Sequence, residues 1–418
     1  MNDEAKTVAA RLKRHAQISR IRGVRTVPRP LPGGGSFDLA YTRTGPRTDL
    51  PVLVFPGGPG LASVLPYRGL RSKGEKLGLD LVMIEHRGVG LSRADPQGGD
   101  LPREAITITE VLDDAAAVLD VEGVDQAVVY GTSYGSYLAQ GFGVRHPNRV
   151  AGMVLDSAML GAHHGPSSSQ MLRELFWHGT GATRAQADRV RRLTGLGVIR
   201  QDEAGFPLQL LHELGGLPLV DRMLDLLDQG RGQGVWRWIQ GLGAGEISAS
   251  RPFMMEFDLV GEIAFRELDY AAAPDGGALD LANSFSEAAQ HFSAFDREPF
   301  DLPAEVSAFT WPTVIISGDR DIRTPRAVAE EIRDRIPNAI LLPVGDHGHS
   351  ALDTHPGLAL DVTLAAVSSI RASGTIEPSA LPTDAHGTRQ LMQRIVHARL
   401  TLARMAPRAR GRAKPPGS

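Results

Sequence analysis

The sequence predicts an α/β protein with a mostly parallel central sheet, helices on both faces and a helical insertion. Short apolar runs of the kind that buried parallel strands give alternate with helical patterns up to residue 158, and they return after residue 308. Between these two parts the apolar runs stop, and helical spacing dominates. A chain of 418 residues has room for one large domain with such an insertion.

The composition narrows the class of protein. The chain has 42% hydrophobic and 22% charged residues, which is typical of a globular protein, and its formal net charge of −3 makes nucleic acid an unexpected partner. It has no Cys, so disulfides, thiolate catalysis and zinc–thiolate sites are excluded. No signal-peptide core and no membrane-length apolar run are present, so we expect a cytoplasmic protein without a membrane partner.

The first part of the chain supplies most of the expected sheet. Residues 1–24 are predicted to form a short basic helix, and 25–158 the first part of the core. A Gly-rich loop joins the first two expected strands, and the later ones are short and apolar. The expected strands are 25–28, 37–44, 51–55, 79–85, 127–130 and 153–155, with a helix over 106–119.

The insertion and the second part of the core follow. Residues 159–308 are predicted to be a helical lid, and 309–372 to return to the core. The expected lid helices are 170–177, 184–193, 208–214, 220–227, 235–239 and 283–295. The expected last elements are strands 313–317 and 339–344 and a helix over 358–370.

The last segment, 373–418, is predicted to be a basic amphipathic helix and a disordered end. After Asp384 it has no acid, but it has eight cationic residues: Arg389, Arg394, Arg399, Arg404, Arg408, Arg410, Arg412 and Lys414. We expect this helix to pack on the body, although an anionic surface or nucleic acid is an alternative partner. The segment supplies no candidate catalytic residue, so any catalytic activity is expected to survive deletion of 387–418 within about threefold.

The segment 127–139 carries the first chemical signal. A short buried strand, the sequence Gly131-Thr-Ser-Tyr-Gly135 and a helix follow one another, which is the context of a nucleophile elbow. The elbow strains the serine backbone, and side chains at the two glycines would crowd the tight strand-to-helix crossing. Ser133 would therefore present its hydroxyl at the carboxyl edge of the sheet, beside the first N–H groups of the helix.

A serine nucleophile needs a base, and the base needs an orienting carboxylate. The loop after strand 313–317 offers Asp319 and Asp321, and the loop after strand 339–344 offers His347 and His349. Parallel strands bring both loops to the same edge as Ser133, in the order serine, acid, base. A metallopeptidase is disfavoured because no H-E-x-x-H motif is present, and we expect no metal or cofactor.

Together these motifs resemble the α/β-hydrolase superfamily, and within it the prolyl iminopeptidase and tripeptidyl-aminopeptidase-like serine peptidases. The resemblance covers about 51–158 and 309–352, and the lid matches only in placement. It rests on Gly57-Gly-Pro-Gly60, on Glu85-His-Arg-Gly-Val-Gly-Leu-Ser92, on the elbow, on Gly318 to Pro325 and on Gly348-His-Ser350.

The resemblance implies a fold and a set of roles. It implies an α/β-hydrolase fold with the lid inserted before the last two strands. Ser133, Asp321 and His349 would form a catalytic triad, with His347 as the rival base. The N–H groups of Gly58 and Tyr134 would form the oxyanion hole. Two residues depart from the family pattern, because Pro56 stands where His is usual and Glu85 where Asp is usual.

The resemblance also implies that lid carboxylates bind the free α-amine of a peptide. The candidates are Glu256, Glu262 and Glu267, with Asp269 beside them, although acids on a lid helix are usually just solvated. Three phenylalanines of the same segment could form a proline-sized pocket or simply pack in the core: Phe253, Phe257 and Phe265.

The expected function is a serine hydrolase that releases N-terminal residues from small peptides through an acyl-enzyme on Ser133. The alternatives are a carboxylesterase or amidase on the same scaffold, acting on a small ester, and a non-catalytic binding protein that kept the fold. The sequence does not predict the oligomeric state.

Overall fold

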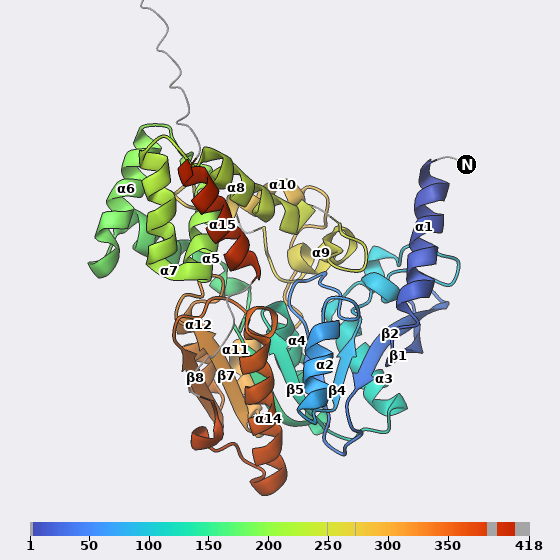
Figure 1. The fold of residues 1–418 in the computed structure, drawn as a ribbon. Helices are drawn as coiled ribbons and strands as arrows, with labels where there is room; N and C mark the ends of the chain where they lie inside the picture. The colour runs from blue at the N-terminus through green and yellow to red at the C-terminus, as the bar shows by residue number, and fades with distance from the viewer. Residues whose placement is uncertain (1–2, 249, 272, 383–390, 406–418) are drawn as a thin grey trace, which may run out of the picture.

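The computed structural model describes residues 3–248, 250–271, 273–382 and 391–405. Its centre is an eight-stranded sheet in the order β1-β2-β4-β3-β5-β6-β7-β8 (Figure 1). The first two strands run antiparallel to their neighbours, and all the others are parallel. The strands are β1 (Val24–Pro30), β2 (Ser36–Thr44), β3 (Val52–Phe55), β4 (Leu81–Ile84), β5 (Ala127–Thr132), β6 (Val150–Asp156), β7 (Thr313–Gly318) and β8 (Ala339–Val344).

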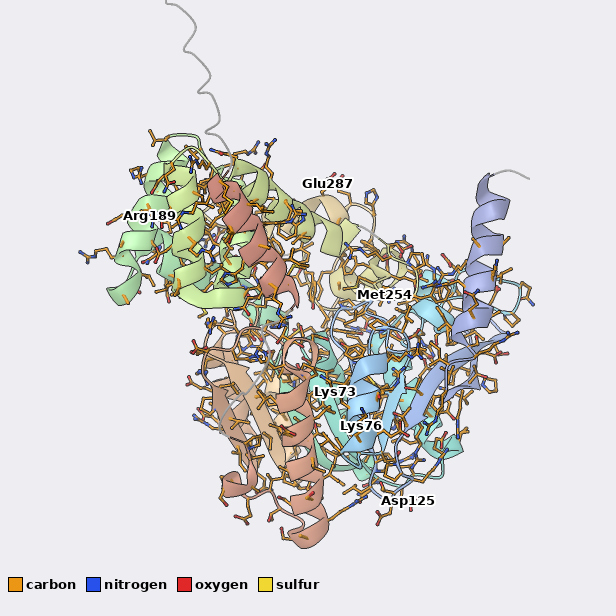
Figure 2. The ribbon with its side chains drawn as sticks, in the orientation of Figure 1. Lys73, Lys76, Asp125, Arg189, Met254 and Glu287 are labelled. Carbon is orange, nitrogen blue, oxygen red and sulfur yellow. The ribbon has the colours of Figure 1, made fainter. Side chains whose placement is uncertain are left out.

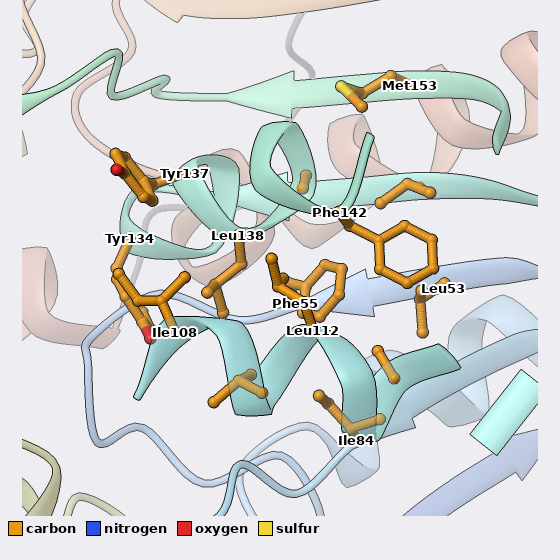
Figure 3. Packing of buried hydrophobic residues seen from close by; sticks show 14 of the residues in the cluster. Leu53, Phe55, Ile84, Ile108, Leu112, Tyr134, Tyr137, Leu138, Phe142 and Met153 are labelled. Atoms are coloured by element: carbon orange, nitrogen blue, oxygen red, sulfur yellow. The ribbon is translucent and has the colours of Figure 1, made fainter. Parts of the chain in front are cut away.

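The inner strands are apolar along their whole length because helices cover both faces of the sheet. In β3, Val52 and Val54 face one layer and Leu53 and Phe55 the other. The first layer contains α2 (Arg68–Lys76) and α14 (Pro356–Ser373), and the second contains α3 (Ile108–Val121), α4 (Tyr134–Arg145) and α12 (Arg326–Arg335). Figure 3 shows the second layer, where Leu53 and Phe55 pack near Phe142. All the strands expected from the sequence are therefore confirmed, with small shifts of their ends.

The lid lies over the carboxyl ends of the parallel strands (Figure 1). Its helices are α5 (Gly165–Arg173), α6 (Arg184–Gly195), α7 (Gly205–Asp228), α8 (Gln233–Ser248), α9 (Phe257–Arg266) and α10 (Asn283–Ala289), and α11 (Leu302–Glu305) follows them. Helices α5 to α8 share a hydrophobic core of their own, whereas α9 packs on the core of the α/β part through Leu259, Val260 and Ile263.

The lid differs from the sequence prediction in the bounds and the number of its helices. The two helices expected at 208–214 and 220–227 form one element, α7, which is kinked where Gly216 adopts a φ of 63°. Helix α10 ends at Ala289, six residues before the expected end of that helix. Helix α9 was expected only as a cluster of acids, although Asp258, Glu262 and Arg266 recur every fourth residue and leave an apolar face, the spacing of an amphipathic helix.

Both terminal helices contact the lid. Helix α1 (Asp3–Ile18) projects beside β1 and β2 (Figure 1), and Arg11 reaches Glu256 of the lid. Helix α15 (Leu391–Met405) packs against α7 and α8, where Val396 and Leu400 are buried in the core of the lid. The expected amphipathic helix is thus confirmed, while residues 383–390 and 406–418, with most of the basic residues, lie outside the described residues.

Two described helices reach 18 residues, α7 with 24 and α14 with 18. Among the residues that the structure describes, no helix combines the length and the apolar character that crossing a lipid bilayer requires.

Candidate active site

Ser133 stands at the sharp turn between β5 and α4. Its backbone has φ 52° and ψ −124°, a conformation that a residue with a side chain rarely adopts. Both glycines of the motif are required by close contacts. A methyl group on Gly131 would lie 2.1 Å from the carbonyl oxygen of Gly135, and one on Gly135 would lie 2.1 Å from the carbonyl oxygen of Phe55. The turn therefore presents Ser133 at the carboxyl edge of the sheet.

Ser133 belongs to a hydrogen-bonded chain with His349 and Asp321. The Oγ atom of Ser133 lies 2.9 Å from Nε2 of His349, and Nδ1 of His349 lies 3.0 Å from each carboxylate oxygen of Asp321. Thr324 fixes the carboxylate, because its N–H and hydroxyl donate to the two oxygens at 3.0 and 2.7 Å. The three residues have the geometry in which a serine can pass its proton to an oriented imidazole.

The charge of Asp321 makes the imidazole of His349 more basic. Burial alone would raise the pKa of Asp321, but the facing His349 and the two donors of Thr324 hold it down to about 2. Burial opposes charging of His349, yet the Asp321 carboxylate raises the pKa of His349 above its ordinary value. The base is therefore oriented with Nδ1 toward the carboxylate, which leaves Nε2 to accept the proton of Ser133.

The rival candidates of the same two loops lie elsewhere. His347 is buried against His355, with ring centroids 4.6 Å apart, and neither of its ring nitrogens has a hydrogen-bond partner among the described residues. Burial lowers the pKa of His347 to about 4, so this ring is neutral. Asp319 accepts a hydrogen bond from the backbone N–H of His347 and so shapes the loop. The geometry thus favours His349 over His347 and Asp321 over Asp319.

Asp156, at the end of β6, holds the segment that carries His349. Its carboxylate accepts hydrogen bonds from the backbone N–H groups of Ala351 and Leu352, each at 2.9 Å, and from Tyr130 and Thr132 of β5. A short helix, α13 (Ala351–Thr354), begins there and sets the direction of the loop. Sequence reasoning gave Asp156 no role, although it stands at the carboxyl end of a predicted central strand, where functional residues gather.

The loop after β3 approaches Ser133 from the other side. A methyl group on Gly57 would lie 3.4 Å from Cβ of Ser133, and Gly58 has a φ of 131°. The N–H of Tyr134 is the first of α4, so it has no acceptor within the helix. These positions fit the predicted oxyanion hole of Gly58 and Tyr134, which stays a prediction.

Glu85 braces the segment that follows the glycine loop. Its buried carboxylate accepts hydrogen bonds from the N–H groups of Ser63 and Val64, at 2.6 and 2.9 Å, and from the N–H of Leu91. It therefore links the end of the glycine loop to the loop after β4.

A cavity of about 370 Å³ opens beside the triad base. Its walls come from the lid, from α15 and from the segment around His349. They consist of Leu210, Glu213, Leu214, Leu242, Arg251, Met255, Arg323, Gly348, His349, Ser350, Asp353, Thr354 and Met392. Five of these side chains are Leu or Met, so the cavity suits an apolar group with a few polar contacts.

The structure does not bring the three predicted lid acids to this cavity. Arg11 pairs with Glu256 at 2.7 Å, and Arg266 pairs with Glu262 at 3.3 Å and with Glu267 at 2.8 Å. All three acids are buried. A buried carboxylate needs cationic or N–H partners, and these three find theirs in the chain itself. Further contacts, at Gly90, Arg103 and Ile108, fasten the three acids to the core, and none of the three lines the cavity.

The three phenylalanines also lie away from the cavity walls. Phe257 and Phe265 pack with Phe292 as a small aromatic cluster, with centroid distances of 5.0 to 6.0 Å. Phe253 lies under the guanidinium of Arg11, 4.9 Å from the ring centroid. The three phenylalanines are therefore packing residues, which was one of the two alternatives that the sequence left open.

The acids that line the cavity are Glu213 and Asp353. Glu213 packs directly on the base loop, because a methyl group on Gly348 would lie 2.6 Å from the Glu213 carbonyl oxygen. Its carboxylate accepts hydrogen bonds from Gln209 at 3.1 Å and Arg323 at 3.3 Å. Burial, opposed by Arg323, raises the pKa of Glu213. Sequence reasoning missed it, although a lone acid in the apolar run 205–220 was a signal.

Asp353 is the second acid that lines the cavity. Its carboxylate accepts hydrogen bonds from the hydroxyls of Tyr67 and of Ser350, the latter at 2.6 Å. Burial raises the pKa of Asp353 above its ordinary value, and the neighbouring charge of Asp156 adds to the effect. The sequence signal was the Ser350-x-x-Asp353 pattern, which is a helix cap.

The comparison with known families agrees with this fold. Residues 51–356 match the family described as alpha/beta hydrolase fold, so the chain belongs to this family. The match begins at β3 and ends just after the segment of His349, and it includes all three residues of the hydrogen-bonded chain.

Sequence similarity to individual curated proteins covers only a part of the chain. A segment of 122 residues is 29% identical to proline iminopeptidases of Neisseria meningitidis and Neisseria gonorrhoeae, covering 29% of this chain and 37% of those proteins. The matched segment thus spans little more than a third of these curated relatives.

Solved structures show the fold alone. VinJ superposes with a TM-score of 0.50 and 16% identity, covering 82% of this chain and 98% of VinJ. Proline iminopeptidase of Mycobacterium smegmatis gives a TM-score of 0.46 and 14% identity, covering 91% of this chain and 100% of that one.

Proposed function

We propose that the protein is a serine hydrolase in which Ser133 attacks an acyl carbon, His349 takes its proton and Asp321 orients the imidazole. The observation that carries this proposal is the continuous hydrogen-bonded chain from Ser133 through His349 to Asp321, at the edge of a cavity. The N–H groups of Gly58 and Tyr134 would stabilise the oxyanion. His349 would then protonate the leaving group, and water would release the acyl group from Ser133.

We further propose that the substrates are small peptides with a free amino terminus, from which the first residue is released. Two observations support this choice over the esterase alternative. The partial identity to proline iminopeptidases is one, and the carboxylate of Glu213 in the cavity beside the base loop is the other. An α-amine is cationic below its pKa of about 8, so it would pair with a carboxylate there. Glu213 takes the role that the sequence assigned to Glu256, Glu262 and Glu267.

The esterase or amidase alternative has a specific observation in its favour. The side chains of Leu210, Leu214, Leu242, Met255 and Met392 make the cavity largely apolar, which would suit the acyl group of a simple ester. The two functions differ in whether the enzyme requires a charged amine.

A pair of substrates separates the two functions. Hydrolysis of prolyl-naphthylamide should exceed that of its N-acetyl derivative by roughly 10- to 150-fold, since a charge-assisted hydrogen bond contributes about 1.5–3 kcal/mol. Glu213→Gln should raise KM for the free amine and leave a neutral ester almost unchanged. Glu287→Gln, at an exposed acid on the far side of the lid (Figure 2), is the matched control. Equal cleavage of free and acetylated substrates would refute the aminopeptidase and favour the esterase.

A further inference from the structure

The chain enters and leaves the lid at neighbouring points beside α12. It enters after β6 through Ala162, His163 and His164, and it leaves through the segment around Glu298. The N–H of Ala162 donates to the Glu298 carboxylate at 2.9 Å, so the two hinge segments lie side by side. Glu331 of α12 lies 3.1 Å from Nε2 of His164. The three segments therefore meet at a cluster of imidazoles and carboxylates that the proposed hydrolysis does not use.

The core of this cluster is a group of three potential ligands. Within the described residues, His163, His164 and Glu331 each offer one ligand atom, and these atoms lie within 4.8 Å of one another. The two imidazole rings are 4.0 Å apart between centroids. Two imidazole nitrogens and one carboxylate oxygen are a donor set that suits Zn²⁺ and related ions.

We propose that His163, His164 and Glu331 bind a divalent first-row transition-metal ion, best matched by Zn²⁺, which fastens the lid hinge to α12. Tetrahedral sites with bonds of about 2.0–2.1 Å place their ligand atoms roughly 3.3 Å apart. The pair His164–Glu331 already has this spacing at 3.1 Å. The ligand atom of the exposed His163 lies within 4.8 Å of the other two, so this side chain has to close the remaining gap. Water would complete the coordination.

Neighbouring side chains orient the proposed ligands. Arg335 donates to Oε1 of Glu331 at 2.7 and 3.0 Å, which leaves Oε2 directed at His164. On the other side, Nδ1 of His163 and Oε2 of Glu298 both lie within about 3 Å of the point where Gly161 would carry a methyl group. Glu298 thus lies near His163 without a hydrogen bond to it, since its Oε2 has no hydrogen-bond partner among the described residues.

The proposal concerns a structural site and does not depend on the proposed hydrolysis. Its test is calorimetric titration of the full-length protein, freed of metal with EDTA and desalted, with ZnCl₂. We expect about one equivalent bound by the wild type. His164→Gln and Glu331→Gln should weaken binding by at least about 100-fold, and Arg335→Gln by about 10-fold, because changes outside the ligand set cost 10- to 100-fold. His178→Gln, at an exposed histidine of the lid, is the matched control and should bind as the wild type does.

Two results would overturn the proposal: no binding of zinc by the wild type, or equal binding by the wild type, His164→Gln and Glu331→Gln. Melting temperatures measured without zinc show whether each variant folds. Should either variant fail to fold, anomalous diffraction at the zinc edge from wild-type crystals locates the ion directly. A peak between His164 and Glu331 supports the proposal, whereas a peak at His347, His349 or His355, or none, contradicts it.

Discussion

Replacement of Leu400 by alanine tests whether α15 is a structural part of the lid. Leu400 is 1% exposed and packs in the hydrophobic core that α5 to α8 form, whereas Leu402 of the same helix is 67% exposed. Truncation of a buried leucine costs about 2–5 kcal/mol, made up of lost transfer free energy and the cavity left behind. An exposed leucine changes the free energy of unfolding by about 0.5 kcal/mol or less. Leu402→Ala is therefore a control of the same chemistry on the same helix.

The assay is urea unfolding followed by tryptophan fluorescence. Three of the four tryptophans lie in the lid, at Trp177, Trp236 and Trp238, so the signal reports mainly on this part. The midpoint for Leu400→Ala should fall well below that of the wild type, while Leu402→Ala should overlay it. Equal midpoints for the two variants would refute the packing of α15 in the lid.

The same packing changes an expectation drawn from the sequence. Met392 of α15 lines the cavity, and residues of this helix complete the core of the lid. Deletion of 387–418 removes one wall of the cavity, so the loss of hydrolysis should exceed the threefold limit that the sequence suggested.

Two further predictions concern the site and the lid. The ratio kcat/KM should rise with pH through the pKa of His349, which Asp321 holds above the ordinary 6.5, because only the neutral imidazole accepts a proton. Asp321→Asn should lower kcat by about 10⁴-fold, and a rate that is independent of pH between about 5 and 8 would contradict this assignment. Glu256→Gln should lower the free energy of unfolding by about 1–3 kcal/mol, since it leaves Arg11 unpaired and weakens the acceptor of the Gly90 N–H. An unchanged melting temperature, equal to that of Glu287→Gln, would show that the Arg11–Glu256 pair does not hold the lid.

The sequence predicted the parts of this protein that local signals determine. A short apolar run indicated each inner strand, and two glycines indicated the elbow. A side chain at either glycine would come within 2.1 Å of a backbone oxygen, so glycine is required there. Each of Ser133, Asp321 and His349 follows a predicted parallel strand. Parallel strands end at one edge of the sheet, so the sequence predicted that these three residues lie together.

The contents of the lid could not be predicted in this way. Glu256 is paired with Arg11, which lies 245 positions away in the chain, and no local pattern reveals such a partner. Met392 reaches the cavity only because α15 returns to the lid after the whole core has been completed. Glu213 is the one acid in the first half of α7, and only its packing on Gly348 shows that it faces the base loop.

The central claim is that His349 and Asp321 activate Ser133, and covalent labelling tests it most directly. The full-length protein is treated with a fluorophosphonate, digested and analysed by mass spectrometry. We expect an adduct on Ser133 in the wild type and in His347→Gln, a strongly slowed reaction in His349→Gln, and none in Ser133→Ala, whose turnover should fall by about 10⁶-fold. An adduct on a different serine, or normal turnover by Ser133→Ala, would show that Ser133 is not the nucleophile.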